Sequence, residues 1–127
     1  MNLVDSCGWL EYFAAGPNAE FFAPAIEDLP QLIVPTLCLF EVFKRVLQQR
    51  GQGDALRAIG AMRQARCIDL TDSLALGAAQ LSVDLKLTLA DSIIFHTAQV
   101  YGALLWTQDA HFERLGGVRF VRKSATP

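Results

Sequence analysis

The feature that most constrains the fold of this chain is a repeated alternation of short apolar runs with longer segments of helical periodicity. The runs cover residues 2–4, 32–34, 67–70, 103–107 and 118–121. A crossover between parallel strands needs a dozen or more residues, usually a helix, so runs spaced in this way favour parallel pairing. The alternation therefore predicts an α/β layered fold around a mainly parallel sheet of four to five strands.

The segments between the runs have the periodicity of helices and the residues typical of helix ends. Apolar residues recur three and four positions apart, and Ser, Thr or Asp stands before most of these patterns while Gly follows several of them. The predicted helices run from the Asp5-Ser6 cap to Gly16, over 19–27, from a Thr36 cap to Gly51, from an Asp54 cap to about 65, and over 73–83, 88–101 and 109–115.

Length and composition predict one globular domain over residues 1–127. The chain has 127 residues, 52% of them hydrophobic, and a net charge of −2, which excludes a disordered protein. The longest uncharged run, 92–108, contains His96, Gln99 and Gly102, so we expect no membrane span. Acids at positions 5 and 11 argue against a secretory signal. A polar tail covers 122–127.

The three cysteines form neither a metal motif nor an evident disulfide set. Cys7, Cys38 and Cys67 are widely spaced and odd in number. We expect Cys38 and Cys67 to be small core residues, because both lie in apolar runs. Free thiols fit a reducing, cytoplasmic compartment.

Charge is distributed unevenly along the chain. Residues 1–43 contain six acids and no Lys or Arg, whereas residues 44–66 contain six basic residues and one acid. An acidic segment beside a basic one fits metal binding next to a track for a polyanion. Two solvated helix faces explain the same pattern equally well.

Four acids fall where parallel sheets place their ligand sites, beyond the carboxyl ends of the strands. Asp5 follows the first predicted strand, Glu41 lies early in the helix after the second, and Asp109 follows the fourth. Asp91 lies near the start of an apolar helix, with no Lys or Arg between Lys86 and Arg114 to pair with it. Each could alone have a structural role, Asp5 and Asp109 as helix caps and Glu41 as a solvated residue.

Taken together, these acids indicate a cation site. Carboxylates converging on one edge repel each other unless a divalent ion neutralises them. Oxygen ligands suit Mg²⁺ or Mn²⁺. The sequence therefore predicts a carboxylate site for Mg²⁺ or Mn²⁺.

The order and spacing of these motifs resemble those of PIN domains, and of the small VapC-type ribonuclease toxins among them. The resemblance rests on Val4-Asp5-Ser6, on Glu41 after Pro35-Thr36, on Ala90-Asp91-Ser92-Ile93-Ile94, and on Thr107-Gln108-Asp109-Ala110-His111-Phe112. It covers nearly the whole chain.

The resemblance implies a three-layer α/β/α sandwich and Mg²⁺- or Mn²⁺-dependent cleavage of RNA. Asp5, Glu41, Asp91 and Asp109 would be the metal-binding and catalytic acids, with Ser6 and Thr107 as supporting hydroxyls. It also implies a homodimer and a cognate antitoxin whose C-terminal segment covers the groove. Cys7 stands where the family often has Asn, so a supporting hydrogen bond is missing or replaced, and His111 stands where some members have a further acid.

The expected mechanism needs no side-chain nucleophile. Asp5, Asp91 and Asp109 would hold the principal metal, which activates a water for attack on the phosphodiester, and Glu41 would bind a second ion or orient that water.

Weaker expectations concern substrate contacts. They include His111, Lys44 and Arg45 as contacts to RNA. Trp9 is expected to be a core residue by its periodicity, with a platform for a base as the alternative, and His96 is expected to be a core histidine.

Other functions receive less support. No G-x-x-x-x-G-K-[ST] or G-x-S-x-G motif occurs, which excludes P-loop hydrolysis and disfavours a serine hydrolase. Cys at position 7 disfavours a phosphatase that requires Asp-x-Asp after the first strand. The main alternative is a PIN-fold module that binds RNA or protein with little turnover, and binding without metal dependence would favour it.

Overall fold

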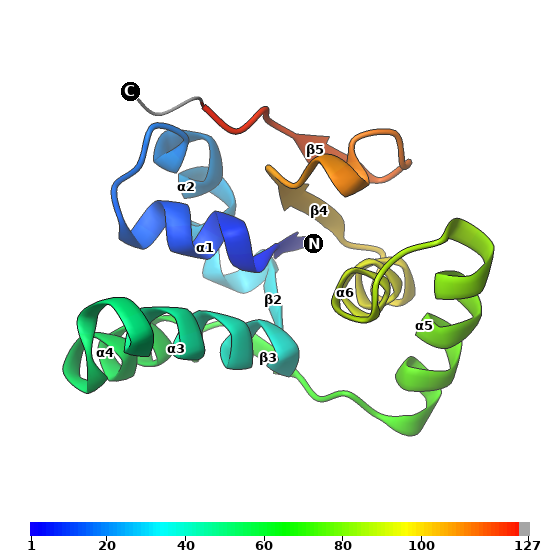
Figure 1. The fold of residues 1–127 in the computed structure, drawn as a ribbon, viewed down its shortest axis with the longest axis horizontal. Coiled ribbons are helices and arrows are strands. Elements are labelled where there is room, and N and C mark those ends of the chain that lie inside the picture. Colours follow the sequence, from blue (N-terminus) through cyan, green and yellow to red (C-terminus); the bar gives the residue numbers. More distant parts are fainter. Residues whose placement is uncertain (125–127) are drawn as a thin grey trace.

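A computed structural model describes residues 1–124, and its centre is a sheet of five strands that are all paired in parallel (Figure 1). The strand order is β3-β2-β1-β4-β5. The strands are β1 (Asn2–Val4), β2 (Leu32–Pro35), β3 (Arg66–Ile68), β4 (Leu104–Thr107) and β5 (Val118–Phe120). The end of the predicted tail, and of the predicted domain, at 125–127 lies outside the described residues.

Helices cover the sheet on two sides, as the predicted sandwich requires. Helices α1 to α4 lie on one side of the strands and α5 and α6 on the other (Figure 1). The helices are α1 (Ser6–Phe13), α2 (Ala19–Glu27), α3 (Thr36–Arg50), α4 (Gln52–Met62), α5 (Asp72–Leu85) and α6 (Leu89–Val100), with short 3₁₀ turns η1 (Leu29–Gln31) and η2 (Ala110–Phe112). The prediction of a three-layer α/β fold is confirmed.

The switch in chain direction across the sheet sets where a ligand site forms. The chain moves outward from β1 through β2 to β3, then returns past β1 to β4. Neighbours β1 and β4 therefore send their following segments to opposite sides of the sheet, which opens a crevice at their carboxyl ends. Asp5 directly follows β1, and Asp109 follows β4 by two residues.

Close packing fixes α1 against the sheet. A Cβ at Gly8 would lie 2.6 Å from a ring carbon of Phe22 and 2.7 Å from a methyl carbon of Val4, so only glycine permits this approach. Trp9 is 1% exposed, so it is a core residue as expected, and the alternative that it stacks a base is wrong. The packing of α1 holds the three residues that begin it, Ser6 to Gly8, at the edge of the sheet.

Several local expectations are corrected. Thr36 is the first residue of α3 rather than its cap, because Pro35 at the end of β2 takes the cap position. Asp54 lies in the first turn of α4, where its carboxylate pairs with Arg50 and Arg57 instead of capping the helix.

The predicted helix 109–115 is only the 3₁₀ turn η2. Cys38 is buried as expected, but Cys67 is exposed, because β3 is short and forms the edge of the sheet. His96 is half-buried rather than a core residue, and its ring lies against Gly77 of α5.

Across residues 1–124, no helix has both the length and the hydrophobicity that a membrane crossing needs.

Candidate metal centre

Asp5 lies where β1 ends and α1 begins, and every contact of its carboxylate is with the protein. Oδ1 accepts a hydrogen bond from the backbone N–H of Ser6 at 2.8 Å, so Asp5 is the N-cap of α1. Oδ2 accepts hydrogen bonds from Thr107 Oγ1 at 2.8 Å and from Cys7 Sγ at 3.3 Å. The thiol of Cys7 thus supplies a donor where a supporting hydrogen bond was expected to be missing or replaced.

Burial raises the pKa of both Asp5 and Cys7. Desolvation raises the pKa of Asp5 to about 6, against the lowering effect of its three hydrogen bonds, and the negative charge of Asp109 adds to the rise. Burial, with the neighbouring Asp5 charge, raises the pKa of Cys7 to about 12. Cys7 therefore remains a protonated thiol that donates to Asp5.

Glu41 is joined to this group through Ser6. Helix α3 carries Glu41 on its second turn, and Ser6 Oγ donates a hydrogen bond to Glu41 Oε1 at 2.6 Å. The two residues are 35 positions apart in sequence. The contact fixes one oxygen of Glu41 and explains the hydroxyl at position 6.

Asp91 lies in the first turn of α6, on the other side of the sheet. Thr88 caps this helix, and its Oγ1 accepts a hydrogen bond from the N–H of Asp91 at 3.4 Å. The Asp91 side chain does not cap the helix; it is 13% exposed and faces His111, whose Nδ1 lies 3.0 Å from Asp91 Oδ2. The partner that the local sequence lacks is therefore supplied by a residue 20 positions away.

The segment after β4 completes the site. Asp109 caps η2 by accepting the N–H of His111 on Oδ1 at 2.9 Å, and the same oxygen lies 3.2 Å from His111 Nδ1. Thr107, which is fully buried, donates to Asp5 and accepts the N–H of Asp109 at 2.9 Å. Thr107 thus links the Asp5 carboxylate after β1 to the backbone of Asp109 after β4. Asp5 and Asp109 therefore act as helix caps and also belong to the candidate site.

One oxygen or nitrogen from each of Asp91, Asp109 and His111 falls within 4.8 Å of the others. This grouping differs from the predicted set of Asp5, Asp91 and Asp109, because it contains His111, while Asp5 adjoins it through Thr107. The Asp91 hydrogen bond, with the charges of both aspartates, raises the pKa of His111. The sequence signal for His111 was its position two residues after Asp109, which was read as a substrate contact.

The donor chemistry of this group fits a divalent cation. Two carboxylates and an imidazole converge from α6 and η2, and the two carboxylates supply the negative charge that attracts an ion. Oxygen-rich sets of this kind accept Mg²⁺ or Mn²⁺, with water completing the coordination.

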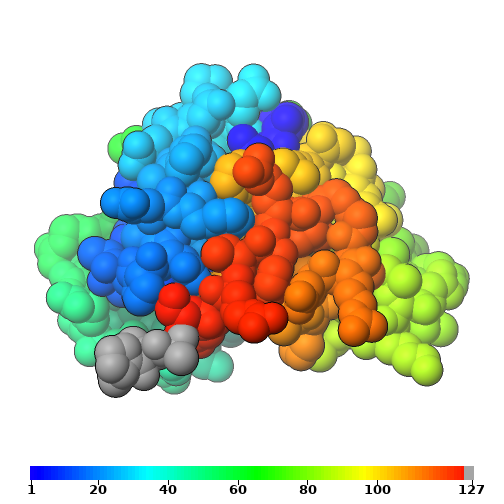
Figure 2. Space-filling view, turned by 90° about the horizontal axis from the view of Figure 1, so that it is seen from above, coloured from blue at the N-terminus to red at the C-terminus, as the bar shows by residue number. Residues whose placement is uncertain are grey.

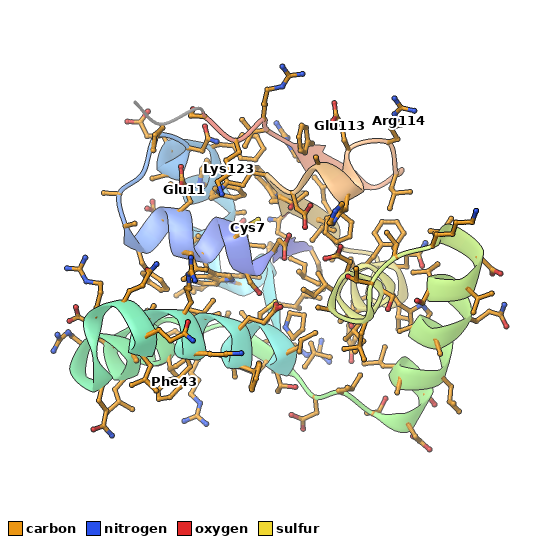
Figure 3. The ribbon with its side chains drawn as sticks, in the orientation of Figure 1. Cys7, Glu11, Phe43, Glu113, Arg114 and Lys123 are labelled. Carbon is orange, nitrogen blue, oxygen red and sulfur yellow. The ribbon has the colours of Figure 1, made fainter. Side chains whose placement is uncertain are left out.

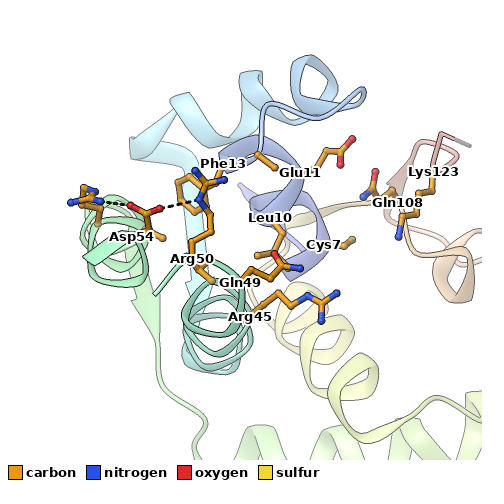
Figure 4. Close-up of a pocket in the computed structure, with 14 residues that line it drawn as sticks. Cys7, Leu10, Glu11, Phe13, Arg45, Gln49, Arg50, Asp54, Gln108 and Lys123 are labelled. Carbon is orange, nitrogen blue, oxygen red and sulfur yellow. Dashed lines mark hydrogen bonds and ion pairs between the residues drawn. The ribbon is translucent and has the colours of Figure 1, made fainter. Parts of the chain in front are cut away.

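A basic pocket adjoins the acidic edge. It has a volume of about 730 Å³ and lies between α1, α3, α4 and the C-terminal segment (Figure 4). Cys7 and Gln108, which flank Asp5 and Asp109 in sequence, form its wall nearest the acids. The charged residues that line the pocket are Arg45, Arg50, Arg57, Lys123, Glu11 and Asp54.

The C-terminal segment contributes to this pocket because it turns back across the face of the molecule. Residues after β5 lie beside the α1–α2 region in the space-filling view (Figure 2). Asn18 Nδ2 donates to the carbonyl of Arg122 at 3.0 Å and to Gln108 Oε1 at 2.9 Å. Lys123 is thereby brought near Glu11 (Figure 3).

The basic segment 44–66 does not act as one surface. Arg45, Arg50 and Arg57 line the pocket, whereas the Lys44 ammonium lies 5.8 Å from the centre of the Phe40 ring, outside the pocket lining. Arg66 lies over Tyr101, with 5.3 Å between its guanidinium carbon and the ring centre.

Several solved structures with the same fold are described as members of toxin–antitoxin systems. A chain in a toxin–antitoxin complex from Klebsiella pneumoniae aligns with TM-score 0.81 and 23% identity, over 94% of this chain and 96% of that one. VapC20 from Mycobacterium tuberculosis, described as a sarcin-ricin loop cleaving toxin, aligns with TM-score 0.76 and 19% identity, over 91% and 95%. A DNA-bound VapBC from Salmonella typhimurium aligns with TM-score 0.73 and 15% identity, over 96% and 98%.

Comparison with curated proteins found no match. The model of the PIN domain family, however, matches residues 3–118, which include all four acids and every strand but the start of the first and the end of the last. The chain therefore belongs to the PIN domain family.

Proposed function

We propose that this protein is a metal-dependent endoribonuclease and the toxin of a toxin–antitoxin pair. The observation that carries the proposal is the convergence of Asp91, Asp109 and His111 within 4.8 Å, beside a buried Asp5 and a Glu41 held by Ser6. Solved structures with this fold include a chain of a toxin–antitoxin complex and VapC20, which is described as a sarcin-ricin loop cleaving toxin.

Each side chain of the site has its own role in this proposal. Asp91 and Asp109, with Asp5 beside them, hold Mg²⁺ or Mn²⁺ at the carboxyl ends of β1 and β4. When bound, the ion lowers the pKa of a water and stabilises charge on the phosphoryl oxygens. Glu41 has one oxygen fixed by Ser6 and orients the attacking water with the other. Thr107 and Cys7 hold the Asp5 carboxylate in position.

The basic pocket is where the RNA backbone approaches this centre. Arg45 and Lys123 are exposed and line the pocket with Cys7 and Gln108, so phosphates passing the acids meet positive charge at once. Arg50 and Arg57 are paired with Asp54 and contribute less. We propose no phosphate contact for Lys44, which lies against Phe40.

The same relatives suggest the protein partners. Complexes of toxin with antitoxin are among them, so we propose a cognate antitoxin that covers the pocket, and a homodimer of this chain in the cytoplasm. An acidic or hydrogen-bonding antitoxin segment would suit the arginine-lined pocket.

The experiment that tests this function is cleavage of a labelled RNA panel by purified, antitoxin-free protein. Reactions contain Mg²⁺, Mn²⁺ or EDTA, and the wild type is compared with Asp91→Asn, which keeps the shape of the side chain but removes its charge. We expect cleavage only with a divalent ion and a loss of at least 100-fold in the variant. Circular dichroism confirms that the variant is folded.

Cleavage in EDTA, or full activity of Asp91→Asn, would contradict the proposed mechanism. RNA binding that is independent of metal, with no cleavage under any condition, would instead support the PIN-fold binding module.

A further inference from the structure

The His111 side chain is 66% exposed, but one nitrogen of its ring lies against both acids of the cluster. Its Nδ1 faces two carboxylate oxygens at once, at 3.0 Å from Asp91 Oδ2 and 3.2 Å from Asp109 Oδ1. The backbone N–H of His111 also donates to that oxygen of Asp109, which fixes where the side chain starts. One ring nitrogen is thus held at the point where the two acids converge.

The distances from His111 Nδ1 to the two carboxylate oxygens match those between neighbouring ligands around one ion. Ligands at about 2.1 Å from an octahedral ion lie about 3 Å apart when they are adjacent. The two measured separations, 3.0 and 3.2 Å, fall close to this value. The ring nitrogen is therefore already where a third ligand would be, without movement of the backbone.

We infer that His111 is a nitrogen ligand of the metal and makes the centre prefer Mn²⁺ to Mg²⁺. The inference rests on the proposed metal centre. Mg²⁺ strongly prefers oxygen ligands, whereas first-row transition ions accept imidazole and bind N/O sites more tightly.

The chain offers a matched control for this inference. It has two histidines, and the second, His96, lies on α6 with its ring against Gly77 of α5. Any histidine signal from a bound ion must therefore come from one of two residues, and the variants His111→Gln and His96→Gln tell them apart.

The test measures metal binding directly rather than activity. Mn²⁺ is titrated into the full-length wild type and each variant, followed by EPR for affinity and by electron spin-echo modulation for imidazole nitrogen, and Mg²⁺ affinity is measured by competition. We expect His111→Gln to lose the nitrogen modulation and to weaken Mn²⁺ binding about tenfold. Mg²⁺ binding should change less than threefold, so the preference for Mn²⁺ falls. His96→Gln should retain the modulation.

Two results would overturn the inference. Retention of the nitrogen modulation in His111→Gln would do so, and so would Mn²⁺ binding that is unchanged or tighter, because His111 would then be a counter-ion that metal displaces. Asp91→Asn separates this failure from failure of the metal centre itself. If Asp91→Asn binds Mn²⁺ as the wild type does, the proposed centre is wrong, whereas loss of binding in Asp91→Asn alone overturns only the role of His111.

Discussion

The two halves of the acidic site differ in how their charges are satisfied. Around Asp5 and Glu41, on the α1–α3 side, the measured carboxylate contacts are donors from the protein: a backbone N–H, two hydroxyls and a thiol. Around Asp91 and Asp109, on the α6–η2 side, two carboxylates share one imidazole nitrogen. In the first half, protein donors bond both oxygens of Asp5 and one oxygen of Glu41, whereas the second half is an arrangement that a cation would complete.

The contacts that hold the site together are therefore distinct from the contacts that a bound ion would change. Donors fixed by α1 and β4 hold Asp5 in place whether or not an ion is bound. Asp91 and Asp109 come from elements on opposite flanks of that network, so their approach is set by the packing of α6 and by Thr107. The packing of the first half therefore positions the acids of the second.

Among the variants that test this comparison, the largest expected effect is that of Thr107→Val, because Thr107 joins the two halves. Thr107→Val removes the hydroxyl that donates to Asp5 and accepts from Asp109 N–H, and so leaves a buried carboxylate oxygen and an amide short of partners. We expect the free energy of unfolding to fall by about 2–3 kcal/mol and RNA cleavage to fall 10- to 100-fold. Urea denaturation and single-turnover cleavage measure the two effects.

Thr107→Ser is the matched control, since it keeps the hydroxyl. It should recover most of the cleavage rate. If Thr107→Val cleaves RNA as fast as the wild type, the two halves are independent of each other and the comparison fails.

A pH series on metal-free protein distinguishes burial from hydrogen bonding at Asp5. Because burial raises its pKa from 3.8 to about 6, the folded protein keeps a proton that the unfolded chain has lost between those values. Stability should therefore decrease as pH rises from about 4 to about 6, by up to about 3 kcal/mol. Urea denaturation in EDTA across this range measures the slope.

Asp5→Asn removes that slope because it cannot ionise. At neutral pH without metal it should be more stable than the wild type, while it cleaves RNA poorly. A variant less stable than the wild type at every pH would show that the hydrogen bonds to the charged carboxylate outweigh its burial.

The smallest expected effect is that of Cys7→Ala. The thiol is the weakest donor to Asp5, at 3.3 Å, and Thr107 and Ser6 still bond the carboxylate without it. We expect cleavage to change less than threefold and stability by about 1 kcal/mol or less. A loss as large as that of Thr107→Val would mean that Cys7 does more than complete the network, and the same cleavage and urea assays detect it.

By itself, the sequence determined the layered fold and the acids that follow its strands. Short apolar runs separated by helical patterns leave parallel pairing as the consistent arrangement, and parallel strands bring their carboxyl ends to one edge. That is why Asp5 and Asp109 could be assigned to one edge before any contact was known, and why an acid in an apolar helix, Asp91, stood out.

Only the tertiary structure decided the partners of these acids and which neighbouring residues belong with them. The Ser6–Glu41 bond joins residues 35 positions apart, Thr107 reaches Asp5 across 102, and His111 meets Asp91 across 20. The exposure of Cys67 followed from its place on the edge strand. Periodicity reports which face of an element is apolar, but contacts between elements depend on how those elements pack, and no local pattern records that distance.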